Sequence, residues 1–373
     1  MKIGITCYPT YGGSGVIATE LGKSLAERGH QIHFISYASP FRLSHYVDNI
    51  FYHEVEKTTY PLFEFNLYPL ELAGKLAEVT EYEGLDILHM HYAIPHATSA
   101  FLAREIIGRD RIKIVTTLHG TDITLIGLEP TFLPLMKFTI QQSDGVTAVS
   151  RFLKEKTLTN YGIDKEIEVI PNFVDTEVYF PQENGAFRNS LAKYGEKIVV
   201  HVSNFRPVKR VPDVIRAFRL IRESVPSVLA LVGDGPGRGE CERLVRELDL
   251  ADVVKFLGKQ EALADILKVS DIFLMPSQSE SFGLSALEAM ACGVPAITTS
   301  VGGLPELNIH GTTGYICEIG DVERMAKYAI DLLNHPEKYR RFSTAARARA
   351  VEFDVRKIVP RYEEVYERVL SGN

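Results

Sequence analysis

Three cations gathered in one short loop of an otherwise acidic chain are the first residues that point to chemistry. Arg206, Lys209 and Arg210 follow an apolar run at residues 197–202, and the whole chain has 48 acidic and 41 basic side chains, a net charge of −7. A guanidinium offers two parallel donors to phosphate oxygens, and an ammonium offers a point charge. We therefore expect Arg206 and Lys209 to bind a diphosphate, with Asn204 beside them. A solvated basic loop is the structural alternative.

Two glutamates flank the expected start of a helix further along the chain. Glu280 lies in a polar loop, and Glu288 lies about one turn into a helix that begins near Phe282 to Leu284. The backbone amides of Phe282, Gly283 and Leu284 favour a phosphate at this helix start. The two carboxylates reach different parts of one ligand, as groups that accept hydrogen bonds from sugar hydroxyls do. The alternatives are a helix N-cap for Glu280 and a solvated helix position for Glu288.

A glycine-rich turn and one histidine are the candidates in the N-terminal half. Gly13, Ser14 and Gly15 open a helix directly after the first strand, where exposed amides and the helix dipole favour an anion. A tight strand-to-helix turn is the alternative. His119 ends a later strand, which makes it a candidate for a catalytic or substrate-contacting imidazole. Its alternative is a hydrogen-bonded structural histidine.

The histidines near residue 90 raise the question of a metal. His89 and His91 share one face of a strand and His96 follows, and neutral imidazole is a good metal ligand. No acidic or thiolate partner joins them, and the chain has no Asp-x-Asp motif for a magnesium-held nucleotide. We therefore expect packing or substrate contact here, and no metal site.

These candidates must be positioned by the strands that precede them. Short runs rich in Val and Ile alternate with longer helical patterns, the rhythm of parallel strands joined by crossover helices. The expected strands cover residues 2–7, 30–36, 87–91, 113–118, 145–149 and 167–170, and then 197–202, 228–232, 253–257, 272–275 and 295–298. Apolar residues also recur along one stripe of a final helix at 354–370.

A break in this alternation divides the chain. It falls at residues 171–175, and the strands restart after a polar stretch. We expect one domain at 1–172, with the C-terminal helix 355–373 packing back on it, and a second domain at 173–354. The predicted fold class is α/β, with two Rossmann-like, doubly wound parallel-sheet domains facing each other across a cleft. Ligands of such sheets bind beyond the carboxyl ends of the strands.

Composition excludes several other classes of protein. The chain has 373 residues, 45% hydrophobic and 24% charged, which is ordinary globular composition rather than that of a disordered chain. The acidic balance argues against nucleic-acid binding, and no apolar run is long enough to cross a membrane. The apolar run at the N-terminus is too short for a signal peptide, so we expect a cytoplasmic protein. The four scattered cysteines read as small buried side chains.

Taken together, the motifs resemble the retaining glycosyltransferases of the family 4 type, which have the GT-B fold. The resemblance rests on the glycine-rich turn, His119, the Arg206/Lys209 loop, the turn at 233–236, and Glu280 with Glu288 eight residues later. Segments 3–16 and 202–211 are most similar to the bacillithiol-pathway branch of this group. Its members transfer N-acetylglucosamine from UDP-N-acetylglucosamine to L-malate.

The resemblance implies a role for each donor residue. Arg206, Lys209 and the amides near Gly15 and at 282–284 hold the diphosphate, whose charge grows as the sugar leaves. Glu288 binds the ribose and the backbone of Leu257 and Gly258 binds the uracil, while Glu280 and His119 contact sugar hydroxyls. The acceptor attacks from the face that the diphosphate leaves, so the reaction needs no protein nucleophile, metal or cofactor. The short spacing between Arg206 and Lys209 leaves Arg210 as a second candidate for the phosphate.

The acceptor site implied by this branch lies in the N-terminal domain, with the nucleotide sugar in the C-terminal one. Malate carries two carboxylates, so its site needs cations or several neutral donors. Tyr92, Thr121, Arg151 and Asn172 lie just past strand ends and are the candidates, with packing or capping as their alternative. Homo-oligomerisation stays open.

Other functions remain open at this point. An enzyme of the same class with an inositol phosphate, a lipid or a polysaccharide as acceptor is the nearest. A two-domain sugar-binding protein without chemistry is another. A nicotinamide oxidoreductase is disfavoured, because no acidic residue follows the second strand to hold the cofactor's ribose.

Overall fold

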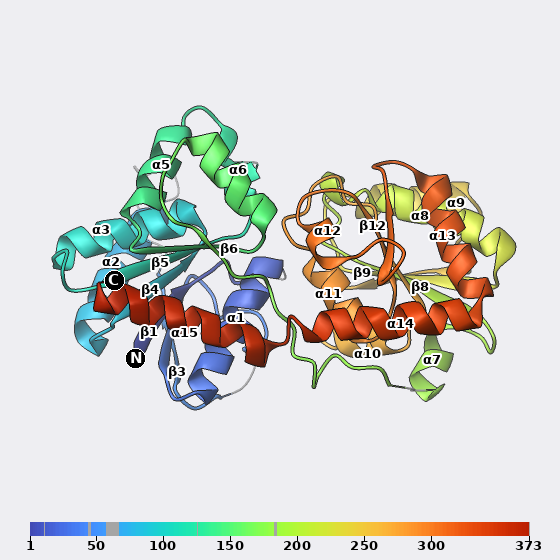
Figure 1. The fold of residues 1–373 in the computed structure, drawn as a ribbon, viewed down its shortest axis with the longest axis horizontal. Coiled ribbons are helices and arrows are strands. Elements are labelled where there is room, and N and C mark those ends of the chain that lie inside the picture. The colour runs from blue at the N-terminus through green and yellow to red at the C-terminus, as the bar shows by residue number, and fades with distance from the viewer. Residues whose placement is uncertain (11, 44–45, 57–66, 125, 183–184, 373) are drawn as a thin grey trace. The chain divides into compact units, whose positions relative to one another are not determined.

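Contacts divide the chain into two compact units. The computed structural model describes residues 1–10, 12–43, 46–56, 67–124, 126–182 and 185–372. One unit comprises Met1–Asn172 with Val355–Asn373, and the other comprises Phe173–Asp354. Tyr11, in the glycine-rich segment, and Asn373, at the end of the expected final helix, lie outside the described residues. Each unit is described on its own below (Figure 1).

The N-terminal unit is built on one parallel sheet. Its strands are β1 (Lys2–Thr6), β2 (Gln31–Ser36), β3 (Ile50–Glu54), β4 (Ile87–His91), β5 (Lys113–Leu118), β6 (Gly145–Ala148) and β7 (Glu168–Val169). They lie side by side in the order β3-β2-β1-β4-β5-β6-β7, so the direction of strand addition reverses between β1 and β4. The inner strand β4 is buried along its whole length, and its histidines His89 and His91 are buried with its apolar residues.

Helices cover both faces of this sheet. They are α1 (Gly13–Glu27), α2 (Tyr68–Glu83), α3 (Thr98–Ile107), α4 (Thr121–Thr124), α5 (Leu133–Gln142), α6 (Arg151–Tyr161) and α15 (Val355–Ser371), with short turns η1 (Ala93–Ala97) and η2 (Ile126–Leu128). Figure 1 shows α15, in red, lying against this unit. Its buried stripe includes Tyr362 and Tyr366, and the Tyr366 hydroxyl lies 2.7 Å from Nδ1 of His89 on β4.

The C-terminal unit repeats the plan with a second parallel sheet. Its strands are β8 (Lys197–Val202), β9 (Ser227–Val232), β10 (Val254–Gly258), β11 (Ile272–Met275), β12 (Ala296–Thr299) and β13 (Gly314–Cys317). Their order is β10-β9-β8-β11-β12-β13, and the reversal falls between β8 and β11. Both sheets therefore have a topological switch point at their first strand.

The helices of this unit alternate with its strands. They are α7 (Gly185–Leu191), α8 (Val211–Ser224), α9 (Arg238–Glu247), α10 (Leu263–Lys268), α11 (Leu284–Ala291), α12 (Leu304–Leu307), α13 (Val322–Asn334) and α14 (Pro336–Val351), with the turn η3 (Pro207–Lys209). Helix α13 begins where the Asp321 side chain accepts a hydrogen bond from the amide of Arg324 at 3.1 Å, an N-cap.

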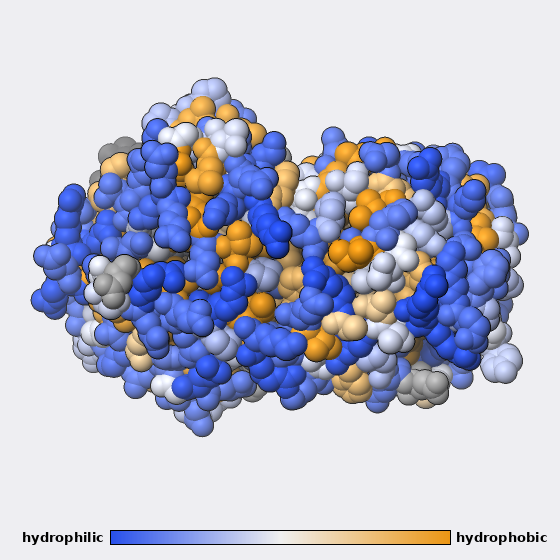
Figure 2. All heavy atoms as spheres, in the orientation of Figure 1, coloured by the Kyte–Doolittle hydropathy of each residue, from blue (hydrophilic) through white to orange (hydrophobic). Residues whose placement is uncertain are grey.

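Apolar side chains gather inside each unit. Core clusters lie between each sheet and its helices, and hydrophilic residues cover most of the face drawn in Figure 2. The four cysteines are all buried and free, as expected. Within the described part of the chain, every helix is too short or too polar to cross a membrane.

The predicted fold class is confirmed, because both units are doubly wound parallel sheets. Every expected strand is present, with ends that differ by no more than one residue from those observed. Two strands were not predicted, β3 at one edge of the first sheet and β13 at one edge of the second. The stripe expected on the final helix is also confirmed.

Candidate active site

Some of the candidate residues of each unit lie at its switch point. In an open parallel sheet the loops that leave the two strands beside this point diverge, and the crevice between them receives ligand. The first turn of α1, after β1, carries Ser14, and the loop after β4 carries Tyr92; their hydroxyls lie 2.9 Å apart. The loops after β8 and β11 carry Lys209 and Glu280, whose charged atoms lie 2.5 Å apart. Each unit thus joins one predicted residue from each side of its own switch point.

Lys209 and Glu280 form the central contact of the C-terminal unit. Their side chains are 21% and 15% exposed, so the pair is partly shielded from water without being sealed off from a ligand. A second bond fixes the Glu280 backbone, whose carbonyl accepts from the amide of Gly303 at 3.1 Å. An ion pair in such a position is stronger than one in open solvent, because the local dielectric is lower.

The two neighbouring arginines, Arg206 and Arg210, differ in their surroundings. Arg206 is exposed at the start of η3. Arg210 donates from Nε to Asp213 at 2.6 Å, in the first turn of α8. The Oδ1 atom of Asn204 is buried without a hydrogen-bond partner among the described residues. Arg210 is thereby occupied by a helix of its own unit, whereas Arg206 and Asn204 retain hydrogen-bonding capacity.

Two glycines allow the backbone to pack closely around these residues. A Cβ atom on Gly235 would lie 1.8 Å from the carbonyl oxygen of Asn204, and one on Gly302 would lie 1.7 Å from that of Glu280. Contacts this short cannot form, so only glycine fits. The turns at 233–236 and 302–306 therefore have a packing function, since they hold the loops that carry Asn204 and Glu280.

The structure contradicts the two structural alternatives considered for Glu280 and Glu288. Its N-cap is Gly283, at φ +98°, and no side chain caps the helix, so the N-cap interpretation of Glu280 is wrong. Glu288 is only 4% exposed, so its interpretation as a solvated residue is wrong too. Phe282 is buried against Phe353, with ring centroids 5.6 Å apart, and anchors the helix start, while Leu284 is half-buried.

The residues assigned to the uracil lie at the end of β10. Gly258 has a φ of +65°, and its carbonyl accepts from the amide of Gly233 at 2.7 Å. The carbonyl of Leu257 accepts from the side chain of Gln260 at 2.5 Å. Both carbonyls therefore have hydrogen-bond partners within the protein. A uracil bound here would contact a backbone segment that these bonds already hold in position.

In the N-terminal unit, Tyr92 connects residues from three loops. Its hydroxyl lies beside that of Ser14 and within hydrogen-bonding reach of Thr121. Burial raises the pKa of Tyr92 to about 12, so the phenol is neutral. Tyr92 has a φ of +104°, which is strained for a residue with a side chain, and such strain is concentrated at functional sites. Gly13 is exposed at the start of α1.

Gly15 has a packing reason to be glycine. A Cβ atom there would lie 2.5 Å from the carbonyl of Tyr8 and 2.8 Å from that of Thr10. The strand-to-helix turn thus requires Gly15 sterically, whatever the turn binds.

His119 is held by a second histidine. Its Nε2 lies 2.8 Å from Nδ1 of His91. Burial, with the nearby His96, lowers the pKa of His119 to about 3, so the ring is neutral near pH 7 and one nitrogen carries a proton. A neutral imidazole in this position can donate to or accept from a hydroxyl, but it does not supply a fixed positive charge.

Asp122 was not selected from the sequence, although it lies three residues after His119. Its carboxylate accepts from the backbone amides of Ala93 at 3.1 Å and Gly120 at 3.0 Å, and it is buried. Burial raises the pKa of Asp122 to about 6. It therefore joins the loops that carry Tyr92 and His119. The sequence feature that could have identified it is a carboxylate two residues after Gly120, just past the end of β5.

The other histidines near residue 90 make hydrogen bonds to the protein. His89 Nε2 lies 2.7 Å from the Thr117 hydroxyl, and His96 Nδ1 lies 2.6 Å from the carbonyl of His91. The packing interpretation agrees with these contacts.

The remaining acceptor candidates follow neighbouring strands. Arg151 is the exposed first residue of α6, and Ser150 caps that helix by accepting from the amide of Leu153 at 3.1 Å. Asn172 is 6% exposed, and its Oδ1 lacks a hydrogen-bond partner among the described residues. Tyr92, Thr121, Arg151 and Asn172 thus follow β4, β5, β6 and β7 in turn, and the structure brings Tyr92 and Thr121 into contact.

Buried histidines make the stability of the N-terminal unit depend on pH. Burial lowers the pKa of His89 and of His119 to about 3, whereas an unfolded histidine titrates near 6.5. The unfolded state therefore binds more protons below pH 6.5, and folding stability falls as the pH falls. Asp122, with its raised pKa, acts in the opposite direction but is a single group. We expect the melting temperature to decrease between pH 7 and pH 5.

Differential scanning fluorimetry across that range tests this expectation. His89→Gln removes one titrating group and should flatten the dependence, whereas His335→Gln, at an exposed position, should leave it unchanged. Equal slopes in the wild type and in both variants would contradict the assignment.

Solved structures place this architecture in a known fold. The Anabaena protein HepE in complex with UDP and glucose matches with a TM-score of 0.83 at 22% identity, covering 98% of this chain and 99% of that one. Sucrose-phosphate synthase from Thermosynechococcus elongatus matches with a TM-score of 0.82 at 22% identity, covering 100% of both chains. Two doubly wound sheets of this kind define the GT-B class of glycosyltransferase.

Sequence comparisons give the family. Residues 11–178 match the family described as Glycosyltransferase Family 4, and residues 183–349 match Glycosyl transferases group 1. The chain is 52% identical to N-acetyl-alpha-D-glucosaminyl L-malate synthase of Bacillus anthracis over 375 residues, which is 100% of this chain and 98% of that protein. It is 30% identical to D-inositol 3-phosphate glycosyltransferase of Gordonia bronchialis over 325 residues, 80% of this chain and 70% of that one. The chain therefore belongs to the family 4, group 1 glycosyltransferases.

Proposed function

We propose that this glycosyltransferase moves N-acetylglucosamine from UDP-N-acetylglucosamine to the hydroxyl of L-malate, the first step of bacillithiol biosynthesis. The observation that carries the proposal is the 52% identity, over the full chain, to a relative named for the product of that reaction. The geometry of the C-terminal unit supports a phosphorylated donor, because Lys209, Glu280 and the exposed Arg206 gather at one switch point.

On the donor side, Arg206 and Lys209 hold the diphosphate, together with amides at the starts of α1 and α11. The charge on the diphosphate grows as the glycosidic bond breaks, so these cations bind the transition state more tightly than the ground state. Glu288 takes the ribose hydroxyls, and the backbone of Leu257 and Gly258 takes the uracil. His119 and Glu280 take hydroxyls of the sugar. Both cations have a carboxylate partner, but Lys209 pairs with Glu280 across the switch point whereas Arg210 pairs with Asp213 on α8, and this position favours Lys209 as the cation for the phosphate.

On the acceptor side, Tyr92, Thr121, Arg151 and Asn172 bind the two carboxylates of malate. The malate hydroxyl attacks the anomeric carbon from the face that the diphosphate leaves, and a phosphate oxygen takes its proton. Configuration at the anomeric carbon is then retained without a protein nucleophile. The cations replace the divalent metal that other transferases use to neutralise the leaving group, so the transfer is metal-independent.

Incubation of the purified protein with both substrates tests this function. We expect UDP release that depends on malate and an α-linked N-acetylglucosaminyl malate, identified by NMR. UDP release at the same rate without malate would reject malate as the acceptor.

A different acceptor is the second candidate. The 30% identity to a D-inositol 3-phosphate glycosyltransferase favours an inositol phosphate over a lipid or a polysaccharide. Parallel assays with D-inositol 3-phosphate in place of malate distinguish the two, since only the true acceptor should give a product at micromolar enzyme.

Arg206→Ala should weaken UDP binding by about 10- to 100-fold, because a charge-assisted pair with phosphate is worth roughly 1.5–3 kcal/mol. Arg206 is exposed, so its removal should leave the melting temperature unchanged. Isothermal titration with UDP measures the effect. Arg219→Ala is the matched control, since Arg219 is about half exposed on α8 and pairs with Glu223. Unchanged affinity in Arg206→Ala would remove this residue from the phosphate site.

A further inference from the structure

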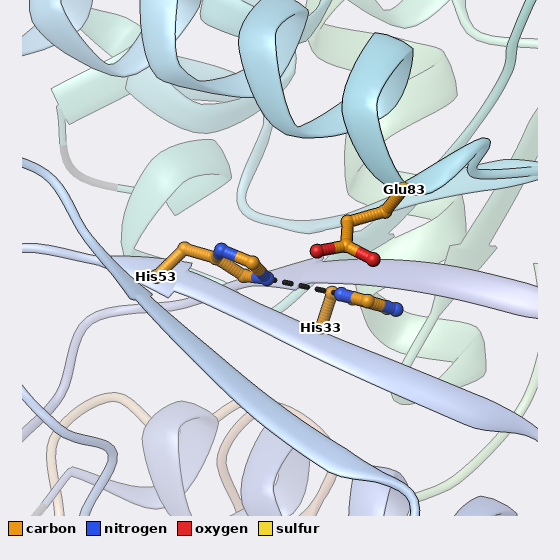
Figure 3. Close-up of side chains that lie close together, drawn as sticks. All are labelled: His33, His53 and Glu83. Atoms are coloured by element: carbon orange, nitrogen blue, oxygen red, sulfur yellow. Dashed lines mark hydrogen bonds between the residues drawn. The ribbon is translucent and has the colours of Figure 1, made fainter.

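A cluster of three potential metal ligands lies in the N-terminal unit, away from the residues discussed above. It consists of His33 on β2, His53 on β3 and Glu83, the last residue of α2. One ligand atom from each residue lies within 4.8 Å of the others. Figure 3 shows the Glu83 carboxylate lying over the two imidazole rings. Two imidazoles and one carboxylate form a donor set that suits zinc and related divalent ions.

Sheet register explains why these side chains meet. His33 pairs with Phe51 and Ile35 pairs with His53 in the parallel ladder between β2 and β3. Residues two apart on a strand share a face, so both histidines lie on the face that also carries Ile35. Ile35 packs in the apolar cluster beneath α2, and α2 ends at Glu83 above the same strands.

The backbone of Glu83 and the ring of His33 are fixed in position. The Lys2 ammonium donates to the carbonyl of Glu83 at 2.7 Å, which holds the end of α2. The His33 ring is 1% exposed and stacks on Phe51, with centroids 4.8 Å apart. His53 and Glu83 are half-buried, so they remain able to adjust.

The hydrogen bonding in this cluster is incomplete without a further group. His33 Nδ1 lies 3.0 Å from His53 Nε2, so the two rings share one proton. The Glu83 carboxylate makes no ion pair with any residue that the structure describes. An ion held by Nδ1 of His33 and Nε2 of His53 would replace the shared proton and give the Glu83 carboxylate a charged partner.

The distances suit a metal after a small adjustment. Two ligand atoms on one tetrahedral zinc lie about 3.3 Å apart, given zinc–nitrogen bonds of about 2.0–2.1 Å. The nitrogens of His33 and His53 are already 3.0 Å apart, and the ring of His53 must tilt for both lone pairs to meet one ion. Glu83 must move inward by on the order of 1 Å, which a half-exposed side chain without an ion pair allows.

A pocket provides access for the ion and a place for a fourth ligand. It has a volume of about 210 Å³ and is lined by His53, Glu78, Val79, Tyr82 and Glu83. Glu78 pairs with Lys75 at 2.9 Å, so the fourth position is left to water from the pocket.

We propose that His33, His53 and Glu83 bind a divalent transition-metal ion of the zinc class. The ion joins edge strand β3 to β2 and α2, and so stabilises the outer edge of the N-terminal sheet. None of the residues proposed for the donor or the acceptor follows β2 or β3 in the described chain, so we assign the ion a structural role and no part in sugar transfer.

Zinc titration of the protein without a histidine tag, after removal of bound metal with a chelator, tests the proposal. We expect one saturable ZnCl2 site by calorimetry and a rise in melting temperature on zinc addition. His53→Gln and Glu83→Gln each remove a ligand and should weaken binding by at least the 10- to 100-fold seen for outer-sphere partners. CoCl2 should give visible absorption bands in the wild type that both variants lose.

Glu81→Gln is the matched control, because Glu81 is exposed on the same turn of α2 and does not belong to the cluster. It should bind zinc like the wild type. Far-ultraviolet circular dichroism of the metal-free variants checks that each one folds. Absence of saturable zinc binding, or equal affinity in all three variants, would overturn the proposal. None of these readouts uses transfer activity, so the result does not depend on the proposed function.

Discussion

Lys209→Ala is expected to lower kcat/KM by about 100- to 1,000-fold and to weaken UDP binding. The reason is that Lys209 supplies a partly buried positive charge where the diphosphate charge develops, and losing one preorganised donor typically has an effect of that size. The variant also leaves the Glu280 carboxylate without this partner, and like charge then faces the leaving group. Steady-state kinetics with UDP-N-acetylglucosamine measures the loss.

Arg210→Ala separates the role of this lysine from general loss of positive charge. Arg210 is the next residue, but it pairs with Asp213, which keeps Arg216 as a partner at 3.1 Å when Arg210 is removed. This variant should retain kcat/KM within a few-fold. A larger loss of kcat/KM in Arg210→Ala than in Lys209→Ala would show that Arg210, and not Lys209, is the cation that binds the phosphate.

Gly302→Ala is expected to lower kcat/KM by about 100-fold without touching any ligand. Its new Cβ would lie 1.7 Å from the carbonyl oxygen of Glu280, so the loop that carries Glu280 must shift. A displacement of about 1 Å in a catalytic group can reduce the rate by that factor. Kinetics and the melting temperature should be measured together, since the shift also lowers stability by roughly 1–3 kcal/mol.

Gly311→Ala provides a matched control for the backbone. Gly302 has a φ of +58° and Gly311 a φ of +75°, so alanine is strained at both, but a Cβ atom on Gly311 meets nothing within 4 Å. The control should lose stability and keep its activity. Equal activity in the two variants would show that the close contact does not position Glu280.

The inner strands could be predicted because their burial is local information. Strands β8 and β9 are inner strands of a parallel sheet, and their sequences at Lys197–Val202 and Ser227–Val232 stand out as runs of Val, Ile and Leu. Strand β3 lies at the edge, where Phe51 is 46% and Tyr52 36% exposed, and its sequence mixes aromatic, histidine and acidic residues. Such a strand forms because it pairs with β2, and its own sequence has no strand-like hydrophobic pattern that would predict it.

The site shows the same division between local and distant information. Lys209 and Glu280 were both recognisable as ligand-binding types, but they are 71 residues apart, and only the adjacency of β8 and β11 brings them together. The environment of Glu288 was harder to predict, because its burial depends on how the surroundings of α11 pack. The histidines 20 residues apart at 33 and 53 have no spacing that signals a ligand set.

The position of α15 affects how the protein is made. The ribosome synthesises the first 172 residues before the roughly 180 residues of the other unit, and α15 is made only after both. At translation rates of about 5–20 residues per second this delay is on the order of 10 s or more. During that time the nascent N-terminal sheet lacks the helix that contributes Tyr362 and Tyr366 to its core. The unit translated first is therefore the last to reach its native packing, and in the meantime its uncovered apolar surface is open to chaperones and to other nascent chains.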